Sequence, residues 1–590
     1  MKKKKYMPQV KIQAAQEKKE VEPLVIIFSI IFFGVTPLIN CKPAYDYTVI
    51  KDVLGALSVA IFGLFLYLSK EEKIFLHKAG FIAAAVLFSW ILIGCFYAPV
   101  KYGAGQALEN YLLYYLLFIT GMLWRWKKRD AFIWAAAMLI ASITAFIQYP
   151  KTHYPISTFG NPNFFAGHLL MPIFLSLYFF KKKMRAVAIA YLAITLAALL
   201  ITKSRASLFA FFSACSFVNF LLLKNHRIPW LKYAGFFIIA ATAASLWHKI
   251  HAQFVEDIRF YIWKGTWKLI QAKIAAGWGT GNFIFYYPYF RFREYFLRPQ
   301  ATPITNHPHC QYLELWSENG IIALVLFGIL LSFAIHNGVK KSAKTSYEIF
   351  VFASTGIIAV LIDNILSTNL TNTSTAMYFW FLMGLCFSWN NDSKAFEISG
   401  TLKKILSMAA FVSMLILGIW KTYYRIVPEI YLKSGIAARE AGDFVSAIEN
   451  YKKVCKINGN HVVAFYKMAF AYGQIGDLKN AEETYLKINN NLFPHFAKTD
   501  GNLGTLYMQM QDLDRAKFYY EIALWFNPYD IDVLFGLVSI KLFHEKDIKG
   551  AKEYLKKAAA INPEHQYIKY LLKTVPELKD TFSPEKQKNK

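Results

Sequence analysis

The chain has 590 residues, of which 56% are hydrophobic and 17% aromatic, and its formal net charge is +28. Soluble proteins average about 45–50% apolar residues, so this composition excludes an ordinary soluble globule, and it equally excludes disorder, collagen and coiled coil. The six cysteines are scattered along the chain and three lie inside apolar runs, which excludes a small disulfide scaffold.

Apolar runs long enough for an α-helix to cross a bilayer recur between residues 24 and 420. They predict an all-α, polytopic membrane protein with about 12 or 13 transmembrane helices. The predicted spans are 24–39, 49–69, 79–97, 107–123, 131–149, 163–180, 186–201, 206–223, 233–247, 311–335, 349–367, 375–390 and 405–420.

The basic residues are divided unequally between the two sides of these spans. With the N-terminus in the cytoplasm, the inner segments hold 27 Lys and Arg, and the short outer loops hold 6. Cytoplasmic loops of membrane proteins carry such an excess. The charge therefore reflects topology, and no nucleic-acid partner is needed to explain it.

Residues 1–22 form a predicted basic cytoplasmic tail. Lys2 to Lys5 before an apolar run resemble the start of a signal peptide, and Cys41 follows Asn40 as in a lipoprotein site. Because Asn40 is bulkier than the residue expected before such a cysteine, we expect an uncleaved first span. We predict a transmembrane domain over 23–424 that contains a large outer loop, 248–310.

The first polar motif is Gly160-Asn161-Pro162-Asn163, at the mouth of the predicted span 163–180. Asn-Pro favours a turn. The amides of Asn161 and Asn163 are suited to bind sugar hydroxyls, although a plain helix cap explains them equally well.

The second motif is Thr202-Lys203-Ser204-Arg205, in a tight outer turn between two spans. Basic residues in an outer turn are unexpected here, because Lys and Arg concentrate in the inner segments. Ionisable groups at the ends of spans are functional candidates by default. The alternative is an arginine that reaches lipid phosphates.

The third motif begins at Arg259 and Lys264, among tryptophan and tyrosine residues that suit a helix lying at the membrane interface. It leads to Gly277-x-Gly279-x-Gly281. This is not a dinucleotide loop, because no strand precedes it.

The fourth motif runs from His307 through His309 and Cys310 to Glu314 and Glu318. These residue types suggest a metal site. However, the histidines flank Pro308 in extended chain, and no second ligand cluster lies on the outer side, so we expect no metal and no other cofactor. Two histidines, two arginines, an amide turn and a Gly-rich loop on one face favour an active site.

Residues 428–565 repeat with a period of 34–35, which is the length of a tetratricopeptide unit. The alanines at 447, 481, 516 and 551 mark the period, and small residues recur at 435, 469, 504 and 539. We predict about four repeats within a domain over 425–590, outside the cytoplasm. Such repeats present a binding surface. We favour protein binding there over mere bracing of the membrane domain.

In this order the motifs resemble the O-antigen ligase family, whose superfamily includes O-antigen polymerases and protein O-oligosaccharyltransferases. The resemblance covers roughly residues 150–390 and rests on Gly160 to Asn163, Thr202-x-Ser204-Arg205, Arg259 with the Gly-rich loop, and His309 followed by Gly320. The family has Asn, Ser or Gln after the histidine, where this chain has Cys310.

The resemblance implies a GT-C-like membrane fold and a metal-independent, inverting glycosyltransferase. The donor would be a glycan on undecaprenyl pyrophosphate, and the acceptor a hydroxyl at the periplasmic face of the bacterial inner membrane. Arginine offers a bidentate, permanently charged partner for pyrophosphate, which suits Arg205 and Arg259. Histidine is the usual base near neutral pH, which suits His309, with His307 as the reserve. We assign substrate contacts to Asn161, Asn163, Ser204, His307, Lys264 and Glu318.

Three acceptors remain open: a lipid A–core sugar (ligase), the growing glycan (polymerase) and a protein hydroxyl (oligosaccharyltransferase). We favour the ligase. Outside this class, a non-catalytic scaffold for envelope polysaccharide assembly would not need the outer Arg and His residues. A flippase should carry charged residues deep inside several spans. The spans of this chain are nearly free of charged residues, and Asp363 is a rare exception.

Overall fold

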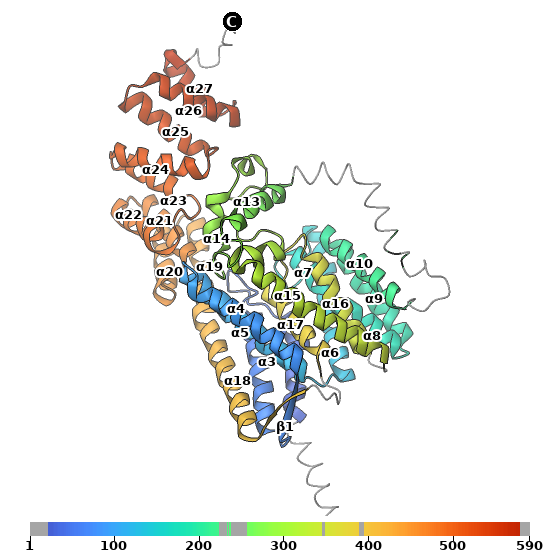
Figure 1. Ribbon diagram of the computed structural model, residues 1–590. Helices are drawn as coiled ribbons and strands as arrows, with labels where there is room; N and C mark the ends of the chain where they lie inside the picture. The colour runs from blue at the N-terminus through green and yellow to red at the C-terminus, as the bar shows by residue number, and fades with distance from the viewer. Residues whose placement is uncertain are drawn as a thin grey trace, which may run out of the picture. The chain divides into compact units, whose positions relative to one another are not determined.

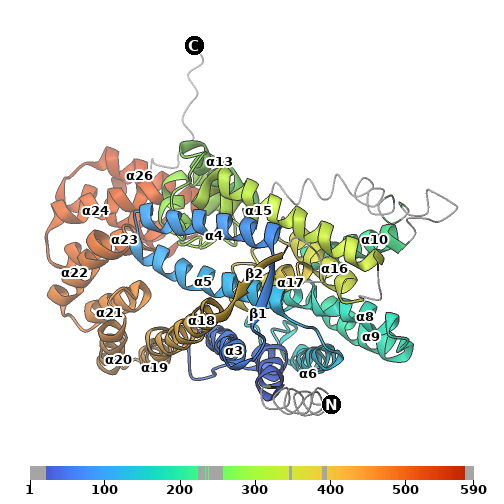
Figure 2. The same cartoon turned by 60° about the horizontal axis from the view of Figure 1, so that its bottom comes forward.

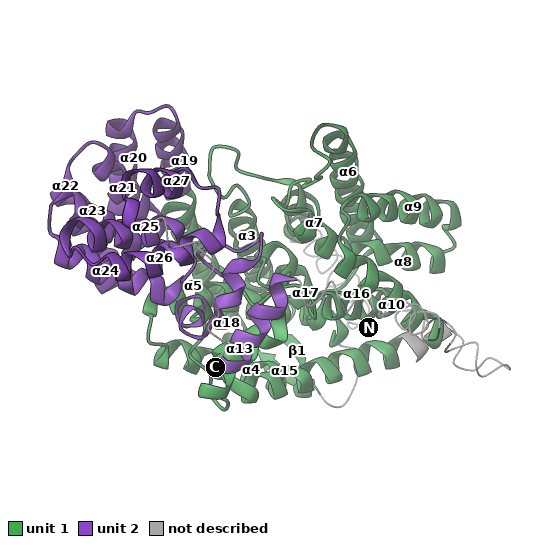
Figure 3. Ribbon diagram, turned by 90° about the horizontal axis from the view of Figure 1, so that it is seen from above, with its two compact units in different colours: residues 1–253, 269–283, 307–427 green, residues 254–268, 284–306, 428–590 purple. Residues whose placement is uncertain are grey.

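The computed structural model describes residues 22–222, 233, 235, 237, 257–344, 348–388 and 395–578, and almost every regular element in it is a helix (Figure 1). The chain divides into two compact units, coloured in Figure 3. Unit 1 is the described part of Met1–Gln253, with Leu269–Phe283 and His307–Val427. Unit 2 is the described part of Phe254–Lys268, with Ile284–Asn306 and Pro428–Lys590.

Unit 1 is built from apolar helices, because only helices satisfy the backbone hydrogen bonds of a spanning segment. Among the described residues, six helical segments are long and apolar enough to cross a membrane, and four apolar helices are shorter. The main helices are α3 (Ile50–Leu68), α4 (Lys78–Tyr97), α5 (Lys101–Leu123), α6 (Lys128–Thr152), α7 (Pro162–Leu169), α8 (Leu175–Lys181), α9 (Arg185–Ile201), α10 (Arg205–Leu222), α15 (Gln311–Lys344), α16 (Glu348–Asp363), α17 (Thr373–Cys386) and α18 (Gly400–Lys421).

A helix occupies each predicted span that lies in the described residues. The first predicted span, 24–39, corresponds to the helical segment Glu22–Leu38. Most of the predicted span 233–247, and all of the predicted tail 1–22 except residue 22, lie outside the described residues. The predicted span 163–180 is interrupted: a short 3₁₀ turn, η2 (Pro172–Phe174), separates α7 from α8. Proline explains the break, because it has no N–H to donate inside a helix.

Glycines allow the central helices of unit 1 to approach closely. Helix α17 packs along α5, and a Cβ on Gly121 would lie 2.0 Å from the carbonyl oxygen of Phe381. A Cβ on Gly384 would lie 1.9 Å from the carbonyl oxygen of Phe118. Small residues have this role in membrane helix pairs, and α17 is buried along its whole length.

The strands of the described structure form a single antiparallel pair, which the sequence does not predict. Strand β1 (Lys73–His77) pairs with β2 (Ala395–Ser399), and Lys73 lies opposite Ser399. Figure 2 shows the pair beside α18. It joins the connection after α3 to the residues that lead into α18, and these two helices pack along each other.

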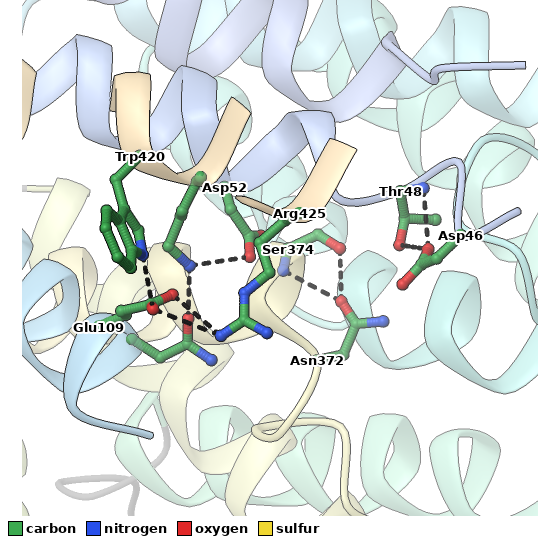
Figure 4. Close-up of polar contacts among 10 residues, drawn as sticks. Asp46, Thr48, Asp52, Glu109, Asn372, Ser374, Trp420 and Arg425 are labelled. Atoms are coloured by element: carbon green, nitrogen blue, oxygen red, sulfur yellow. Dashed lines mark hydrogen bonds and ion pairs between the residues drawn. The ribbon is translucent and has the colours of Figure 1, made fainter. Parts of the chain in front are cut away.

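A polar cluster fixes the far end of α18 against α3 and α5 (Figure 4). Lys421 Nζ lies 3.2 Å from Asp52 and donates to Asn110 at 2.7 Å. The Glu109 carboxylate accepts from Trp420 Nε1 at 3.0 Å and from Arg425 at 3.3 Å. Helix α18 continues through the π-helical turn η6 (Thr422–Ile426) into α19 (Val427–Glu440) without an intervening coil.

The C-terminal part of unit 2 is a series of helix pairs. The first helices of the pairs are α19, α21 (Val462–Gln474), α23 (Thr499–Gln509) and α25 (Ile531–Ser539). Their partners are α20 (Phe444–Ile457), α22 (Leu478–Lys487), α24 (Leu513–Phe526) and α26 (Ile548–Ile561), and α27 (Gln566–Thr574) follows. Small residues face tyrosines: a Cβ on Gly435 would lie 2.5 Å from the Tyr451 ring, and one on Gly504 would lie 2.4 Å from the Tyr520 ring.

Adding a methyl group at Gly504 should therefore destabilise the repeats. Gly504→Ala forces the Tyr520 ring to move, and such overpacking costs about 1–3 kcal/mol. The control is Gly473→Ala, where the new Cβ meets nothing within 4 Å and helix propensity improves by about 1 kcal/mol. Thermal unfolding of the full chain in detergent should show a lowered midpoint for Gly504→Ala only. Equal midpoints for the two variants would contradict this packing.

Candidate functional site

The amide turn of the first motif is a helix cap. Gly160 has φ +79°, and the side-chain oxygen of Asn161 accepts a hydrogen bond from the backbone N–H of Asn163 at 2.8 Å. Pro162 occupies the first turn of α7, where its missing N–H costs nothing. The Asn163 side chain is exposed, whereas Asn161 is half-buried.

The turn that carries Arg205 is fixed by a buried carboxylate. Asp363 is fully buried at the end of α16, and it accepts hydrogen bonds from Ser207 Oγ at 2.7 Å, Ser367 Oγ at 2.6 Å and Asn369 Nδ2 at 2.6 Å. Ser204 is buried too, and its hydroxyl lies 3.1 Å from that of Ser207. Arg205 itself is exposed at the first position of α10.

The next residue, Asn364, fixes the start of the helix that follows His309. Its backbone carbonyl accepts from the N–H of Gln311, the first residue of α15, at 3.0 Å. Its side-chain oxygen accepts from the N–H of Leu370 at 3.0 Å. The start of α10 and the start of α15 are thus attached to neighbouring residues of one loop, and this brings the segments of Arg205 and His309 together.

Helix α7 packs against the same loop. A Cβ on Gly167 would lie 2.1 Å from Asn369 Nδ2, so glycine is needed for this approach. Three of the sequence motifs, represented by Asn161, Arg205 and His309, therefore lie on segments that converge on residues 363–372.

The two histidines of the fourth motif have different environments. His307 Nδ1 lies 2.9 Å from Glu314 Oε1. Burial acts to lower the pKa of His307, but the carboxylates of Glu314 and Glu318 outweigh it and raise that pKa above its ordinary value. His309 is exposed and has φ +54°, in the left-handed region that non-glycine residues seldom adopt. Cys310 is buried, and burial raises the pKa of its thiol.

The Gly-rich loop is bound by Glu318. The Glu318 carboxylate accepts from the backbone N–H of Gly281 at 2.9 Å and from that of Phe283 at 3.0 Å. The φ angles of Gly277, Gly279 and Gly281 are +74°, +94° and +73°, which L-residues adopt rarely. Glu318 thus serves to hold this loop beside the His307–Glu314 pair.

Gly320, the motif residue that follows His309, is required by its backbone conformation and by a close contact. Its φ of +73° and ψ of 176° bend α15 at this point, and a Cβ here would lie 1.8 Å from the carbonyl oxygen of Ala275. Only glycine fits both the backbone conformation and the contact.

Arg259 lies in unit 2, near the start of α13 (Ile258–Ala272). The side chain of Asp257 caps this start by accepting from the N–H of Arg259 at 2.8 Å. The Lys264 ammonium is exposed and lies 4.2 Å from the centroid of the Phe292 ring. The cation of Lys264 is thus held over an aromatic ring on the surface.

Sequence reasoning missed the residues that organise the site. Asp363 was recognisable in the sequence as an acidic residue inside an apolar run. Its role became clear only from its hydrogen bonds with Ser207, Ser367 and Asn369. Asn364 and Asn369 gave no local signal, and Glu314 was noted in the fourth motif without its role as the partner of His307. Within the described ranges, no three His, Cys, Asp or Glu side chains gather in a way that could hold a metal ion.

The His307–Glu314 pair should make stability depend on pH. A raised pKa in the folded protein means that the stabilisation is complete below the ordinary histidine pKa of about 6.5 and is lost as the pH rises through the raised value. The melting midpoints of wild type and His307→Gln should therefore converge as the pH increases through this window. In a Glu314→Gln background the convergence should disappear. A constant difference at all pH values would show that the pair is not ionised.

Two comparisons identify segments of the chain. Residues 190–328 match the family model of the O-antigen ligase, and residues 501–528 match that of the tetratricopeptide repeat. The first match contains Arg205, Arg259, the Gly-rich loop and His309 through Gly320. It confirms the resemblance that the motifs predicted. The chain is therefore a multi-pass, helical membrane protein in which residues 190–328 are similar to the O-antigen ligase family and residues 501–528 to a tetratricopeptide repeat.

Proposed function

We propose that this protein transfers a glycan from undecaprenyl pyrophosphate to a hydroxyl of lipid A–core, at the periplasmic face of the inner membrane. The family match supports a ligase-like or polymerase-like glycosyltransferase. The observation that carries the proposal further is the attachment of the Arg205 and His309 segments to the adjacent residues Asp363 and Asn364.

In the proposed reaction, the acceptor oxygen attacks the anomeric carbon of the donor sugar from the face opposite the pyrophosphate. The new glycosidic bond forms as the bond to the phosphate oxygen breaks, and the configuration inverts. The acceptor proton passes to the base, and undecaprenyl pyrophosphate leaves. Arg205 and Arg259 neutralise the leaving group through bidentate hydrogen bonds, so the transfer needs no metal ion and no other cofactor.

His309 is the proposed base, and the environment of His307 supports this choice. The raised pKa of His307 keeps its imidazole more protonated at a given pH than a free histidine, and a protonated imidazole cannot accept the acceptor's proton. His307 instead adds positive charge. His309 is exposed at the end of the loop that precedes α15, where an acceptor can reach it.

The remaining candidate residues fall into two groups, those that are exposed and those that form hydrogen bonds within the protein. Asn163 and Lys264 are exposed and are proposed to contact the glycan and the donor phosphates. Asn161, Ser204 and Glu318 make hydrogen bonds within the protein. We propose that these three residues shape the substrate site by holding its turns in place.

The repeats favour one alternative acceptor. Because tetratricopeptide surfaces bind proteins, the protein O-oligosaccharyltransferase reaction is the second candidate. Deletion of the gene separates the acceptors by glycan mass spectrometry: full-length lipid-linked polymer indicates a ligase, single repeat units a polymerase, and loss of modified peptides an oligosaccharyltransferase.

We further propose that residues 23–424 form the transferase domain, with a cytoplasmic N-terminus, and that residues 425–590 form a periplasmic repeat domain. The bias of 27 to 6 basic residues supports this orientation. Alkaline phosphatase fused after Lys421 should then be active, as should a fusion within 248–310. An inactive fusion after Lys421 beside an active one in the loop would place the repeats in the cytoplasm.

Substitutions should separate donor binding from proton transfer. His309→Ala should retain donor binding and lose transfer by about 10²–10⁴-fold, as expected for a missing base, while His307→Ala should cost much less. Arg259→Lys should stay strongly impaired, because lysine lacks the planar fork. The measurement is single-turnover transfer from lipid-linked donor in EDTA, with donor binding followed separately. Wild-type transfer by His309→Ala, or a requirement for added Mg²⁺ or Mn²⁺, would contradict the mechanism.

A further inference from the structure

The connection between the second and third helix pairs departs from the pattern of the others. Three other connections in this series are four residues long: 458–461, 527–530 and 562–565. Here α22 is followed by the π-helical turn η7 (Ile488–Leu492) and then by residues 493–498. Within this stretch His495 has φ +59°, and its Nδ1 lies 2.9 Å from Asp500 Oδ2. The contact between His495 and Asp500 thus helps to hold this longer connection in its conformation.

Aromatic residues of the outer loop pack on this connection, and all of them belong to unit 2. Phe285 is buried, and its ring centroid lies 4.4 Å from that of Phe493. Tyr289 packs against Phe526 at 5.4 Å and His495 at 6.1 Å. Aromatic rings at such distances attract each other beyond the effect of the area they bury, so these contacts hold the loop on the repeats.

The same loop holds the helix that carries Arg259. A Cβ on Gly265 of α13 would lie 2.9 Å from both the Phe290 carbonyl and the Tyr287 ring, so the loop backbone touches the helix directly. Phe292 lies under the ammonium groups of Lys264 and Lys268, at 4.2 and 4.3 Å.

Two buried or half-buried arginines stiffen this loop. Arg298 donates to Tyr261 Oη of α13 at 2.5 Å. Arg291 lies over the rings of Tyr295 and Phe296 at 4.9 and 5.1 Å and donates to the Pro303 carbonyl at 3.1 Å. Packed contacts therefore run without a gap from the repeats, through residues 285–298, to α13.

We propose that the repeat domain positions Arg259, with Phe285 and Tyr289 as the positioning residues, and so sets how well the enzyme holds the pyrophosphate of its donor. This inference rests on the proposed function. A guanidinium binds pyrophosphate in bidentate fashion only when its helix is correctly placed, and a misplacement of about 1 Å can cost 10²-fold in rate. The repeats then act on the donor site, whichever acceptor the enzyme uses.

The test compares Tyr289→Ala with Tyr289→Phe in the full-length protein. Tyr289 is 42% exposed, so the alanine variant should fold. Its contacts with the repeats are made by the ring, so phenylalanine should restore wild-type behaviour. We expect Tyr289→Ala to lower kcat/KM for the lipid-linked donor about 10–100-fold. The control is Phe543→Ala, another exposed aromatic residue of the repeats, which should transfer at the wild-type rate.

Two further measurements distinguish positioning from general damage. If Tyr289 acts through Arg259, Tyr289→Ala should have little additional effect in the Arg259→Lys background, because effects on one shared interaction are not additive. Hydrogen exchange of residues 258–272 should accelerate in Tyr289→Ala and stay unchanged in Phe543→Ala.

Additive effects, or wild-type transfer together with wild-type exchange in Tyr289→Ala, would overturn the positioning role. If wild type itself fails to transfer from the lipid-linked donor, the proposed function fails, and the exchange rates still decide whether the repeats hold α13.

Discussion

The arrangement of the site depends on one buried carboxylate. A charged group among apolar helices must have its lone pairs satisfied, because the uncompensated burial of a charge is very costly. Asp363 meets this demand with donors from the Arg205 turn and from the loop that follows α16. Since Asn364 simultaneously holds the start of α15, a single short loop fixes the helix starts that carry two of the three proposed catalytic residues.

Around this anchor, glycines and carboxylates determine the finer geometry. Glu318 accepts hydrogen bonds from the backbone amides of Gly281 and Phe283, and Gly320 lets α15 bend against Ala275. Glu314 contacts the half-buried His307, whereas His309 is exposed. Neighbouring residues of similar chemistry thus have different environments, because their hydrogen-bond partners differ.

The repeats and the segment that carries Arg259 belong to the same compact unit, unit 2. Helix α18 continues into the first repeat helix without a break, and Lys421 and Arg425 hold its end through partly buried polar contacts with Asp52 and Glu109. Within unit 2, Phe285 and Tyr289 make aromatic contacts with the repeats. These aromatic contacts, with the approach of Phe290 and Tyr287 to Gly265, connect the repeats with the segment that carries Arg259.

The sequence by itself determined the properties that are local or periodic. Span positions follow from runs of apolar residues, the repeats from a recurrent small residue opposite a tyrosine, and the motifs around Arg205, Arg259 and His309 from their order along the chain. It did not reveal the break at Pro172, the β1–β2 pair, or the inward roles of Glu318 and Ser204. The break at Pro172 is local, and Ser204 contacts Ser207 three residues away. The β1–β2 pair and the inward role of Glu318 depend on partners more than 30 residues away, as do the contacts of Asp363 with Ser207 and of Phe285 with Phe493. Only the tertiary structure decides such contacts, because burial and hydrogen-bond satisfaction arise when distant helices meet.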